Sequence, residues 1–229
     1  IEGHCTDVVT DLAVDWLKQE RDPDKPFMLM VQHKAPHRNW MPALRHLPLY
    51  ADTEMPEPNT LFDKWHDNAP PARFQELEID RHMHLNFDLF VDLVPSFDGN
   101  ALKGQFDRSA WRNMQRMSPA QLEAWRAAYA PRDAAFHQAY LQADVLVRWK
   151  YQRYVKDYLR CVASVDDNIG RLLDYLDAAQ SKTRSYVAFL AEAPRDFAGV
   201  GDVETFGAVS VVERGGGRRI PVLAEGVLG

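Results

Sequence analysis

LVRWKYQRYVKDYLRCVASVDDNIGRLLDYLDA, residues 146–178, has the clearest periodicity in the chain. Its apolar residues recur at alternating steps of three and four, which is the spacing of one face of an α-helix. They are Tyr151, Val155, Tyr158, Val162, Val165, Ile169, Leu172 and Leu176. The length and single occurrence of this pattern favour a helix packed on a sheet over a coiled coil. We therefore expect one long helix whose apolar stripe faces the core.

Two short apolar runs, Phe27–Val31 and Ser185–Leu190, have the length of strands and do not alternate. Such runs are typical of strands buried on both faces, which belong to parallel sheets covered by helices. An amphipathic helix precedes the first run, with Thr6 as its expected N-cap and residues 8–17 forming its apolar face. The order of helix, strand, excursion, helix and strand predicts an α/β fold with a mostly parallel sheet flanked by helices.

The middle and the end of the chain show no clean period. Residues 41–142 are expected to form a long irregular excursion that holds short helices, for instance Pro119–Tyr129. Eight of the 12 glycines lie in the last 31 residues. Glycine costs backbone entropy in regular elements, so little stable structure is expected there. We expect one domain over residues 1–197 and a divergent, poorly structured tail over residues 198–229.

The composition excludes several classes of protein. With 46% hydrophobic and 26% charged residues, the 229-residue chain has the composition of a globular protein with a core. No apolar run is long enough to span a membrane, so no membrane partner is expected. The net charge of −6 argues against a nucleic-acid partner. The oligomeric state stays open.

The ends of the chain and its cysteines give further expectations. The first residues contain no initiator Met and no signal peptide, so we expect a fragment or a processed product. Cys5 and Cys161 are the two cysteines. Two thiols form neither a disulfide scaffold nor a four-thiolate metal site.

The loop after the first apolar run is the main candidate site, because ligands of doubly wound sheets bind beyond the carboxyl ends of the strands. Its sequence, residues 32–38, is QHKAPHR. Lys34 and Arg38 would balance the charge of an anion, and His37 could donate a proton to a leaving oxygen. A solvated surface loop with incidental histidines is the alternative that composition leaves open. The loop after the second run, residues 191–196, is the second candidate.

Several separate motifs carry a resemblance to a known family. They are Thr6-Asp7, Thr10-Asp11, Trp16-Leu17, Lys25-Pro26-Phe27, residues 33–38, residues 149–154 and residues 164–173. In this order they resemble the type I sulfatases of the alkaline phosphatase superfamily, in particular the bacterial arylsulfatase-like branch that desulfates carbohydrates. The similarity covers roughly residues 3–182 and implies that the chain is part of an alkaline-phosphatase-like sandwich.

The resemblance implies hydrolysis of sulfate esters. In that family a Cys or Ser becomes formylglycine, whose hydrate attacks sulfur while Ca²⁺ holds the sulfate oxygens. By residue match, the histidine that assists the leaving group is His37, and Lys34 and Arg38 are expected to contact the substrate. The partner implied is a sulfated carbohydrate or a small sulfate ester. A periplasmic or extracellular location is implied by the resemblance alone.

The sequence also departs from the family pattern. Neither cysteine lies in the C-x-P-S-R type motif, and the family's Asp-Asp calcium pair belongs before Ile1. After the second run the chain has Ala191-Glu192-Ala193-Pro194, where Glu192 could replace an aspartate as an oxygen ligand and Ala193 cannot coordinate. We therefore expect this chain alone to be inactive and to bind no Ca²⁺, and a full-length form to hydrolyse sulfate esters.

Two other functions stay open on the same residues. One is a non-catalytic sulfatase-like protein that binds sulfated glycans, and the other is a phosphatase or phosphonate hydrolase of the same superfamily. Two lesser features have ordinary structural interpretations that are favoured. His82 and His84 are expected to form a surface turn and not a metal pair, and Asp166 and Asp167 are expected to be helix-surface residues. The tryptophans in and beside the excursion either fill the core or stack on a sugar. These are Trp40, Trp65, Trp111 and Trp125.

Overall fold

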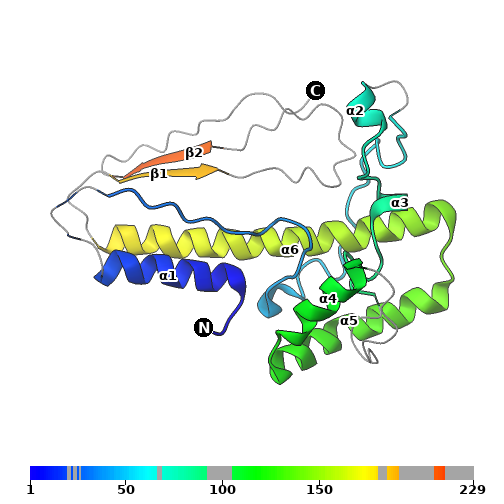
Figure 1. Ribbon diagram of the computed structural model, residues 1–229, viewed down its shortest axis with the longest axis horizontal. Coiled ribbons are helices and arrows are strands. Elements are labelled where there is room, and N and C mark those ends of the chain that lie inside the picture. Colours follow the sequence, from blue (N-terminus) through cyan, green and yellow to red (C-terminus); the bar gives the residue numbers. More distant parts are fainter. Residues whose placement is uncertain are drawn as a thin grey trace. The chain divides into compact units, whose positions relative to one another are not determined.

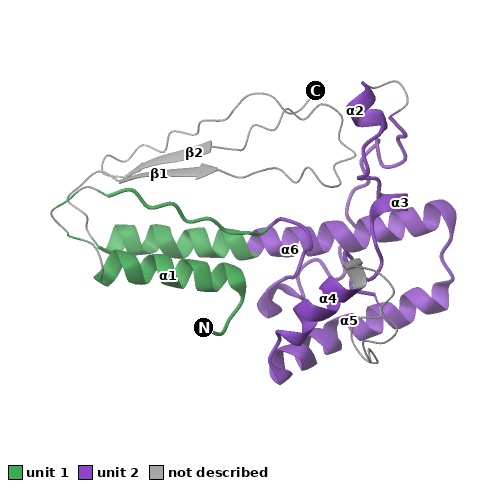
Figure 2. Ribbon diagram, in the orientation of Figure 1, with its two compact units in different colours: residues 1–35, 164–229 green, residues 36–163 purple. Residues whose placement is uncertain are grey.

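The computed structural model describes residues 1–19, 22, 25, 27–65, 69–91, 105–179, 185–190 and 209–214. In these residues the helices are α1 (Cys5–Gln19), η1 (Leu44–His46), α2 (Pro70–Arg73), α3 (Ile79–His82), α4 (Gln105–Gln115), α5 (Pro119–Ala139) and α6 (Ala143–Ala178) (Figure 1). The strands are β1 (Ser185–Leu190) and β2 (Val209–Arg214). The chain forms two compact units, one of residues 1–35 and 164–229 and one of residues 36–163 (Figure 2).

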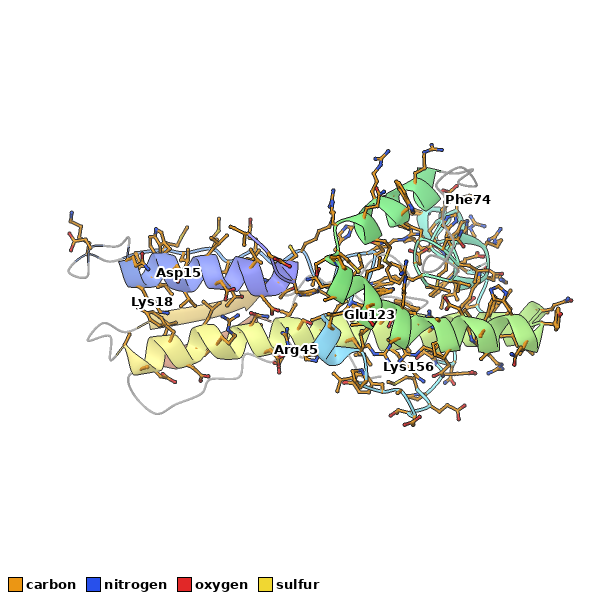
Figure 3. The ribbon with its side chains drawn as sticks, turned by 90° about the horizontal axis from the view of Figure 1, so that it is seen from below. Asp15, Lys18, Arg45, Phe74, Glu123 and Lys156 are labelled. Atoms are coloured by element: carbon orange, nitrogen blue, oxygen red, sulfur yellow. The ribbon has the colours of Figure 1, made fainter. Side chains whose placement is uncertain are left out.

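Helix α1 confirms the amphipathic helix expected near the start of the chain, but not its cap. The helix begins at Cys5, so Thr6 lies inside it and the predicted N-cap is wrong. The buried face consists of Thr6, Thr10, Ala13 and Leu17. The expected face was wider, and Leu12 is 53% exposed. Asp15 and Lys18 are exposed on the other side of the helix (Figure 3).

Helix α6 confirms the long helix, yet the side chains it buries are not the predicted stripe. Of the eight stripe residues, Val165 is fully buried and the others are half-buried. The most buried residues of α6 are Val147, Lys150, Arg153, Tyr154, Asp157, Arg160, Cys161, Ser164, Val165 and Asn168. Most of these side chains are polar. They are tolerated in the interior because each of the charged ones among them has hydrogen-bond partners.

The core of the second unit is an aromatic cluster. It contains Leu47, Phe90, Ala110, Met114, Trp125 and Tyr129. The rings of Trp125 and Tyr129 stack with 4.4 Å between centroids, and Phe90 meets the Trp125 ring edge-on at 5.2 Å. Aromatic pairs at these distances add to the free energy gained from burying their area. This cluster packs Leu47 and Phe90 against α4 and α5.

Helix α5 is longer than the helix expected over Pro119–Tyr129. Ser118 caps its start: the hydroxyl accepts from the backbone N–H of Gln121, whose side chain in turn accepts from the N–H of Ser118. The helix then continues through Pro131. A proline inside a helix removes one backbone hydrogen bond. The turn beyond it is held by Asp133, which accepts a 3.0 Å bond from Arg153.

The sheet seen in the described residues differs from the expected one. Strand β1 confirms the strand predicted at Ser185–Leu190, and it pairs antiparallel with β2, Ser185 opposite Arg214 and Leu190 opposite Val209. Phe27–Val31 is not assigned as a strand: Met28 is 82% exposed and Met30 is 69% exposed. A strand exists through ladder bonds to a neighbour, and the described residues provide none for this run. The mostly parallel sheet is therefore not seen in this part of the chain.

Strand β2 lies within the segment 198–229, for which little regular structure was expected. The remaining residues of that segment lie outside the described residues, and the domain boundary at 197 stays a prediction. None of the helices that the structure describes is long and apolar enough to cross a membrane.

Helix α6 holds residues 41–91 through their backbone carbonyl groups. In the described parts of residues 41–91, the short helices η1, α2 and α3 alternate with turns and irregular chain. Side chains of α6 donate to seven carbonyl oxygens there. The pairs are Lys150 with Ile79, Asp80 and Met83, Tyr151 with Pro56, Gln152 with Met55, Arg153 with Leu89, and Arg160 with Leu49. These bonds satisfy carbonyl groups that irregular chain leaves without helix or sheet partners.

Candidate active site

His37, the predicted proton donor, is an exposed side chain in a loop of the second unit. Its Nδ1 lies 2.5 Å from the carbonyl oxygen of Arg38. A carbonyl oxygen only accepts, so Nδ1 carries the proton of this hydrogen bond. The other ring nitrogen, Nε2, is therefore the atom that can exchange a proton with a bound molecule.

The backbone on both sides of His37 is fixed by neighbouring side chains. The indole Nε1 of Trp40 donates to the carbonyl oxygen of Pro36 at 2.8 Å, and Nδ2 of Asn39 donates to the carbonyl oxygen of Phe87 at 3.0 Å. Trp40 is only 1% exposed, and its ring lies 4.5 Å from that of Tyr154, centroid to centroid. The loop is thus anchored while the imidazole stays accessible.

Arg38, the next residue, is bound to a buried carboxylate. Its Nε donates to Oδ1 of Asp88 at 2.5 Å and its Nη2 donates to Oδ2 at 2.7 Å. This is the two-pronged geometry in which arginine binds carboxylates most strongly. Nη2 also donates to the carbonyl oxygen of His82 at 3.3 Å, and the guanidinium lies 5.2 Å from the centre of the Phe87 ring. The contact of Arg38 with substrate that the sequence predicts stays untested.

Lys34 and His33 belong to the first unit and differ in exposure. Lys34 is exposed, as a sulfate-binding ammonium group requires. Both ring nitrogens of His33 are buried, and neither has a hydrogen-bond partner among the described residues. Burial lowers the pKa of His33, although the negative charge of Asp7 opposes this effect. The imidazole of His33 is therefore harder to protonate than its ordinary pKa would suggest.

The predicted metal ligand, Glu192, lies outside the described residues. Within the described part of the chain, no three His, Cys, Asp or Glu side chains come close enough together to hold a metal ion. The donor set expected for Ca²⁺ is therefore not assembled by these residues. A hard cation of this kind takes six to eight oxygen ligands.

The structure also shows the surroundings of the lesser candidates. Nδ1 of His82 accepts from the backbone N–H of Glu78 at 3.1 Å, and His84 is exposed in the turn that follows. Asp166 and Asp167 are exposed on α6. Three of the four tryptophans, Trp40, Trp65 and Trp125, are buried, whereas Trp111 is half-buried. Buried rings fill the core and offer no face to a sugar.

Sequence reasoning did not find Asp88. This carboxylate is fully buried and lies 50 residues from the arginine it binds. No spacing rule connects a loop residue with a turn so far along the chain. The one local signal is that the backbone N–H of His84 donates to Oδ2 of Asp88 at 2.7 Å, which is the kind of short-range bond aspartate forms in turns.

Residues 2–192 match the sequence pattern of the Sulfatase family, so the chain belongs to that family. It is similar to N-acetylglucosamine-6-O-sulfatase of Bacteroides thetaiotaomicron, with 37% identity over 191 residues, 83% of this chain and 33% of the relative. A solved structure in complex with its substrate, D-glucosamine-2-N,6-O-disulfate, is also similar. It has a TM-score of 0.70 and 39% identity over 79% of this chain and 35% of the other.

The comparisons confirm the family that the sequence motifs indicate, and the structural neighbour is consistent with the alkaline-phosphatase-like fold. The chain spans about a third of the length of each of these two proteins. About two thirds of the length of each relative therefore lies outside the matched region.

Proposed function

We propose that this chain forms one wall of the active site of a hydrolase that cleaves a sulfate ester of a carbohydrate, in particular an amino sugar sulfated at O6. The observation that carries the proposal is the exposed imidazole of His37, held on an anchored loop in a chain of the sulfatase family. The names of the two similar proteins, which both include a 6-O-sulfated glucosamine, support the choice of sugar.

In the proposed reaction His37 acts as a general acid. As the attacking nucleophile, which is supplied outside the described residues, bonds to sulfur, the bond between sulfur and the ester oxygen breaks and the sugar leaves with the electron pair on its oxygen. Nε2 of the protonated imidazole donates its proton to that oxygen, so the product is a neutral sugar hydroxyl and not an alkoxide. The hydrogen bond from Nδ1 to the carbonyl oxygen of Arg38 fixes the ring and leaves Nε2 as the nitrogen that faces a bound molecule. His37 recovers its proton before the next turnover.

Lys34 is proposed to contact the sulfate oxygens. Its ammonium group is exposed and lies three residues before His37 in the sequence. Lysine binds oxyanions as a point charge, so it tolerates the change in sulfate geometry during transfer. Glu192 is proposed as an oxygen ligand for the Ca²⁺ that the family generally uses, with the remaining ligands supplied outside the described residues.

We also propose that in the complete alkaline-phosphatase-like sandwich Phe27–Val31 joins the mostly parallel sheet. The exposure of Met28 and Met30 supports this. When a neighbouring strand or helix covers an exposed apolar side chain, apolar area is removed from water and the folded protein is stabilised. The domain proposed for residues 1–197 would end soon after β1.

The test is sulfate release from N-acetylglucosamine-6-sulfate, measured with this chain and with the longest protein that its gene encodes. We expect the chain alone to release none and the longest product to release sulfate. In that product His37→Ala should lower the turnover number by about 100-fold or more, because a general acid contributes about that much. His84→Ala is the matched control, since His84 is also an exposed histidine in a loop and should not change the rate.

Two outcomes would favour the other functions. Tight binding of the sulfated sugar without any sulfate release would indicate a non-catalytic glycan-binding protein. Release of phosphate or phosphonate from the corresponding esters, with no release of sulfate, would indicate a different hydrolase of the superfamily.

A further inference from the structure

We propose that Asp88 is a positioning residue for His37 and acts on it through Arg38. This inference rests on the proposed function for the catalytic role of His37. The contacts among Asp88, Arg38 and His37 do not depend on that function. The residues involved all belong to the second unit, residues 36–163.

The first step is the pairing of two charges at the edge of the core. Asp88 has no exposed area, and the side chain of Arg38 is 17% exposed. A buried carboxylate is costly unless its oxygens are bonded, and here both accept from the same guanidinium. The plane of the guanidinium is therefore set by the plane of the carboxylate. The Arg38 side chain connects this carboxylate to the Arg38 backbone, so the pairing also restricts where that backbone can lie.

The second step is the link from Arg38 to the imidazole. Nδ1 of His37 is bonded to the carbonyl oxygen of Arg38 itself. A displacement of the Arg38 backbone therefore moves the acceptor that fixes the ring and its protonated nitrogen. Asn39, on the other side, is held by the carbonyl oxygen of Phe87, the residue before Asp88. The turn that contains Phe87 and Asp88 thus holds both Arg38 and Asn39.

The third step is the rigidity of the turn that carries Asp88. Backbone N–H groups of Asp88 and Val91 donate within the turn, to His84 and Leu85, at 3.0 and 2.9 Å. Lys150 donates to the carbonyl oxygen of Met83, and Arg153 to that of Leu89, so α6 holds the turn at both ends. Asp88 is therefore a fixed support and not a mobile counter-ion.

These contacts assign Arg38 a role other than binding sulfate. A guanidinium that is paired with a carboxylate presents little net charge to an anion. The alternative, that Arg38 contacts sulfate directly, predicts a different kinetic result and is decided by the same experiment.

The first measurement compares two substrates in the longest protein that the gene encodes. Asp88→Asn removes the charge and keeps the size of the side chain. We expect kcat for N-acetylglucosamine-6-sulfate to fall by about 10- to 100-fold, because a misplaced acid protonates the sugar oxygen poorly. With 4-nitrophenyl sulfate, whose leaving group departs without a proton, kcat should change by less than about 3-fold. KM should stay within about 2-fold for both.

Asp80→Asn is the matched control. Asp80 also accepts from a cationic side chain, Lys64 at 2.6 Å, in the same part of the chain, but it makes no described contact with Arg38. Its loss should leave both turnover numbers unchanged. Equal losses on the two substrates in Asp88→Asn would show a merely structural role and overturn the proposal.

A second variant covers the case in which Asp88→Asn does not fold. Arg38→Lys keeps a positive charge beside Asp88 but loses the two-pronged bond. We expect a smaller loss with the same dependence on the substrate. A rise in KM for both substrates, with kcat unchanged, would instead assign Arg38 to sulfate binding and overturn the proposal.

The last measurement does not need activity and so separates this proposal from the proposed function. The ¹⁵N chemical shifts of the neutral His37 ring report which nitrogen carries the proton. In the wild type we expect it on Nδ1, and in Asp88→Asn a mixture of the two forms. Identical shifts in wild type and variant would overturn the positioning role, whether or not any sulfate is released.

Discussion

At the scale of single residues, the two cysteines differ in their surroundings. Cys5 is exposed at the start of α1, whereas Cys161 is 3% exposed. Burial raises the pKa of the Cys161 thiol, and the negative charge of Asp157 raises it further. Since the thiolate is the reactive form, Cys161 is expected to be inert near neutral pH.

This difference gives the first prediction. The folded chain treated with iodoacetamide at about neutral pH should be labelled once, at Cys5, as measured by peptide mass spectrometry. Cys5→Ser should then show no label without denaturant, and one label at Cys161 in urea. Labelling of Cys161 in the folded chain would contradict its burial.

His33 gives a prediction on pH. Its pKa is lowered from the ordinary 6.5, so above that pH the ring is neutral in both the folded and the unfolded chain. As the pH falls from about 6.5 through the lowered pKa, the unfolded chain takes up the proton more readily. The free energy of unfolding should therefore fall on acidification, by less in His33→Asn than in the wild type.

The measurement is urea denaturation at about pH 7.5 and about pH 5. His84→Asn is the control, because His84 is exposed and the variant should keep the wild-type pH dependence. If His33→Asn loses as much stability on acidification as the wild type, the buried ring nitrogens are not the cause.

The candidate site was predicted from the sequence in part. The loop with His37 was recognised because its residue types suit an anion and its motif resembles a family, and both signals are local. Asp88 was missed because its role depends on a contact across 50 residues. A side chain that acts through another leaves no mark in the spacing of the residues around the site.

At the scale of elements, α6 shows where periodicity succeeds and where it fails. The apolar spacing gave the helix and its end at Ala178 correctly. The same spacing predicted the wrong buried stripe, because it considers apolar side chains alone. Lys150, Arg153 and Arg160 are buried and donate hydrogen bonds to backbone carbonyl oxygens. Helix α5 extends past the predicted end at Tyr129 and through Pro131, and the bond from Arg153 to Asp133 beyond the proline is a contact that apolar spacing does not reveal.

The buried face of α6 leads to a prediction on stability. Asp157 accepts from Nη1 of Arg160 at 2.6 Å and from the hydroxyl of Tyr129 at 3.0 Å, and none of the three is more than 1% exposed. Asp157→Ala leaves two buried donors without their carboxylate. The free energy of unfolding should fall by about 3–5 kcal/mol.

Urea denaturation of the chain measures this loss. Asp166→Ala is the matched control on the same helix, because Asp166 is exposed, and it should change the free energy of unfolding by no more than about 0.5 kcal/mol. Similar losses in the two variants would mean that the buried face is not what stabilises the helix.

At the scale of the whole molecule, the order of the motifs identified the family, since the matched residues 2–192 run through both compact units. The sheet was not predicted with the same success. A strand is defined by its hydrogen bonds to a neighbour, and the described residues provide no such neighbour for Phe27–Val31. Helices carry their hydrogen bonds within one segment, which is why the sequence located α1 and α6.

The exposed run predicts self-association of the chain. Met28 and Met30 are exposed in an extended segment, which is the kind of surface on which other chains pair. Met28→Lys combined with Met30→Lys should slow aggregation, as measured by sedimentation at several concentrations. Leu12→Lys combined with Val145→Lys is the control, because it adds the same charge at two exposed apolar positions on helices. Equal effects would point to net charge and not to the run.

The bonds from α6 to the excursion have a consequence for divergence among related chains. Lys150, Arg153 and Arg160 donate to carbonyl oxygens, which every amino acid carries. The amino acids at the accepting positions can therefore be exchanged without losing these bonds, so long as the path of the backbone is kept. These irregular segments can therefore change in sequence while the helix beside them keeps the same three cations.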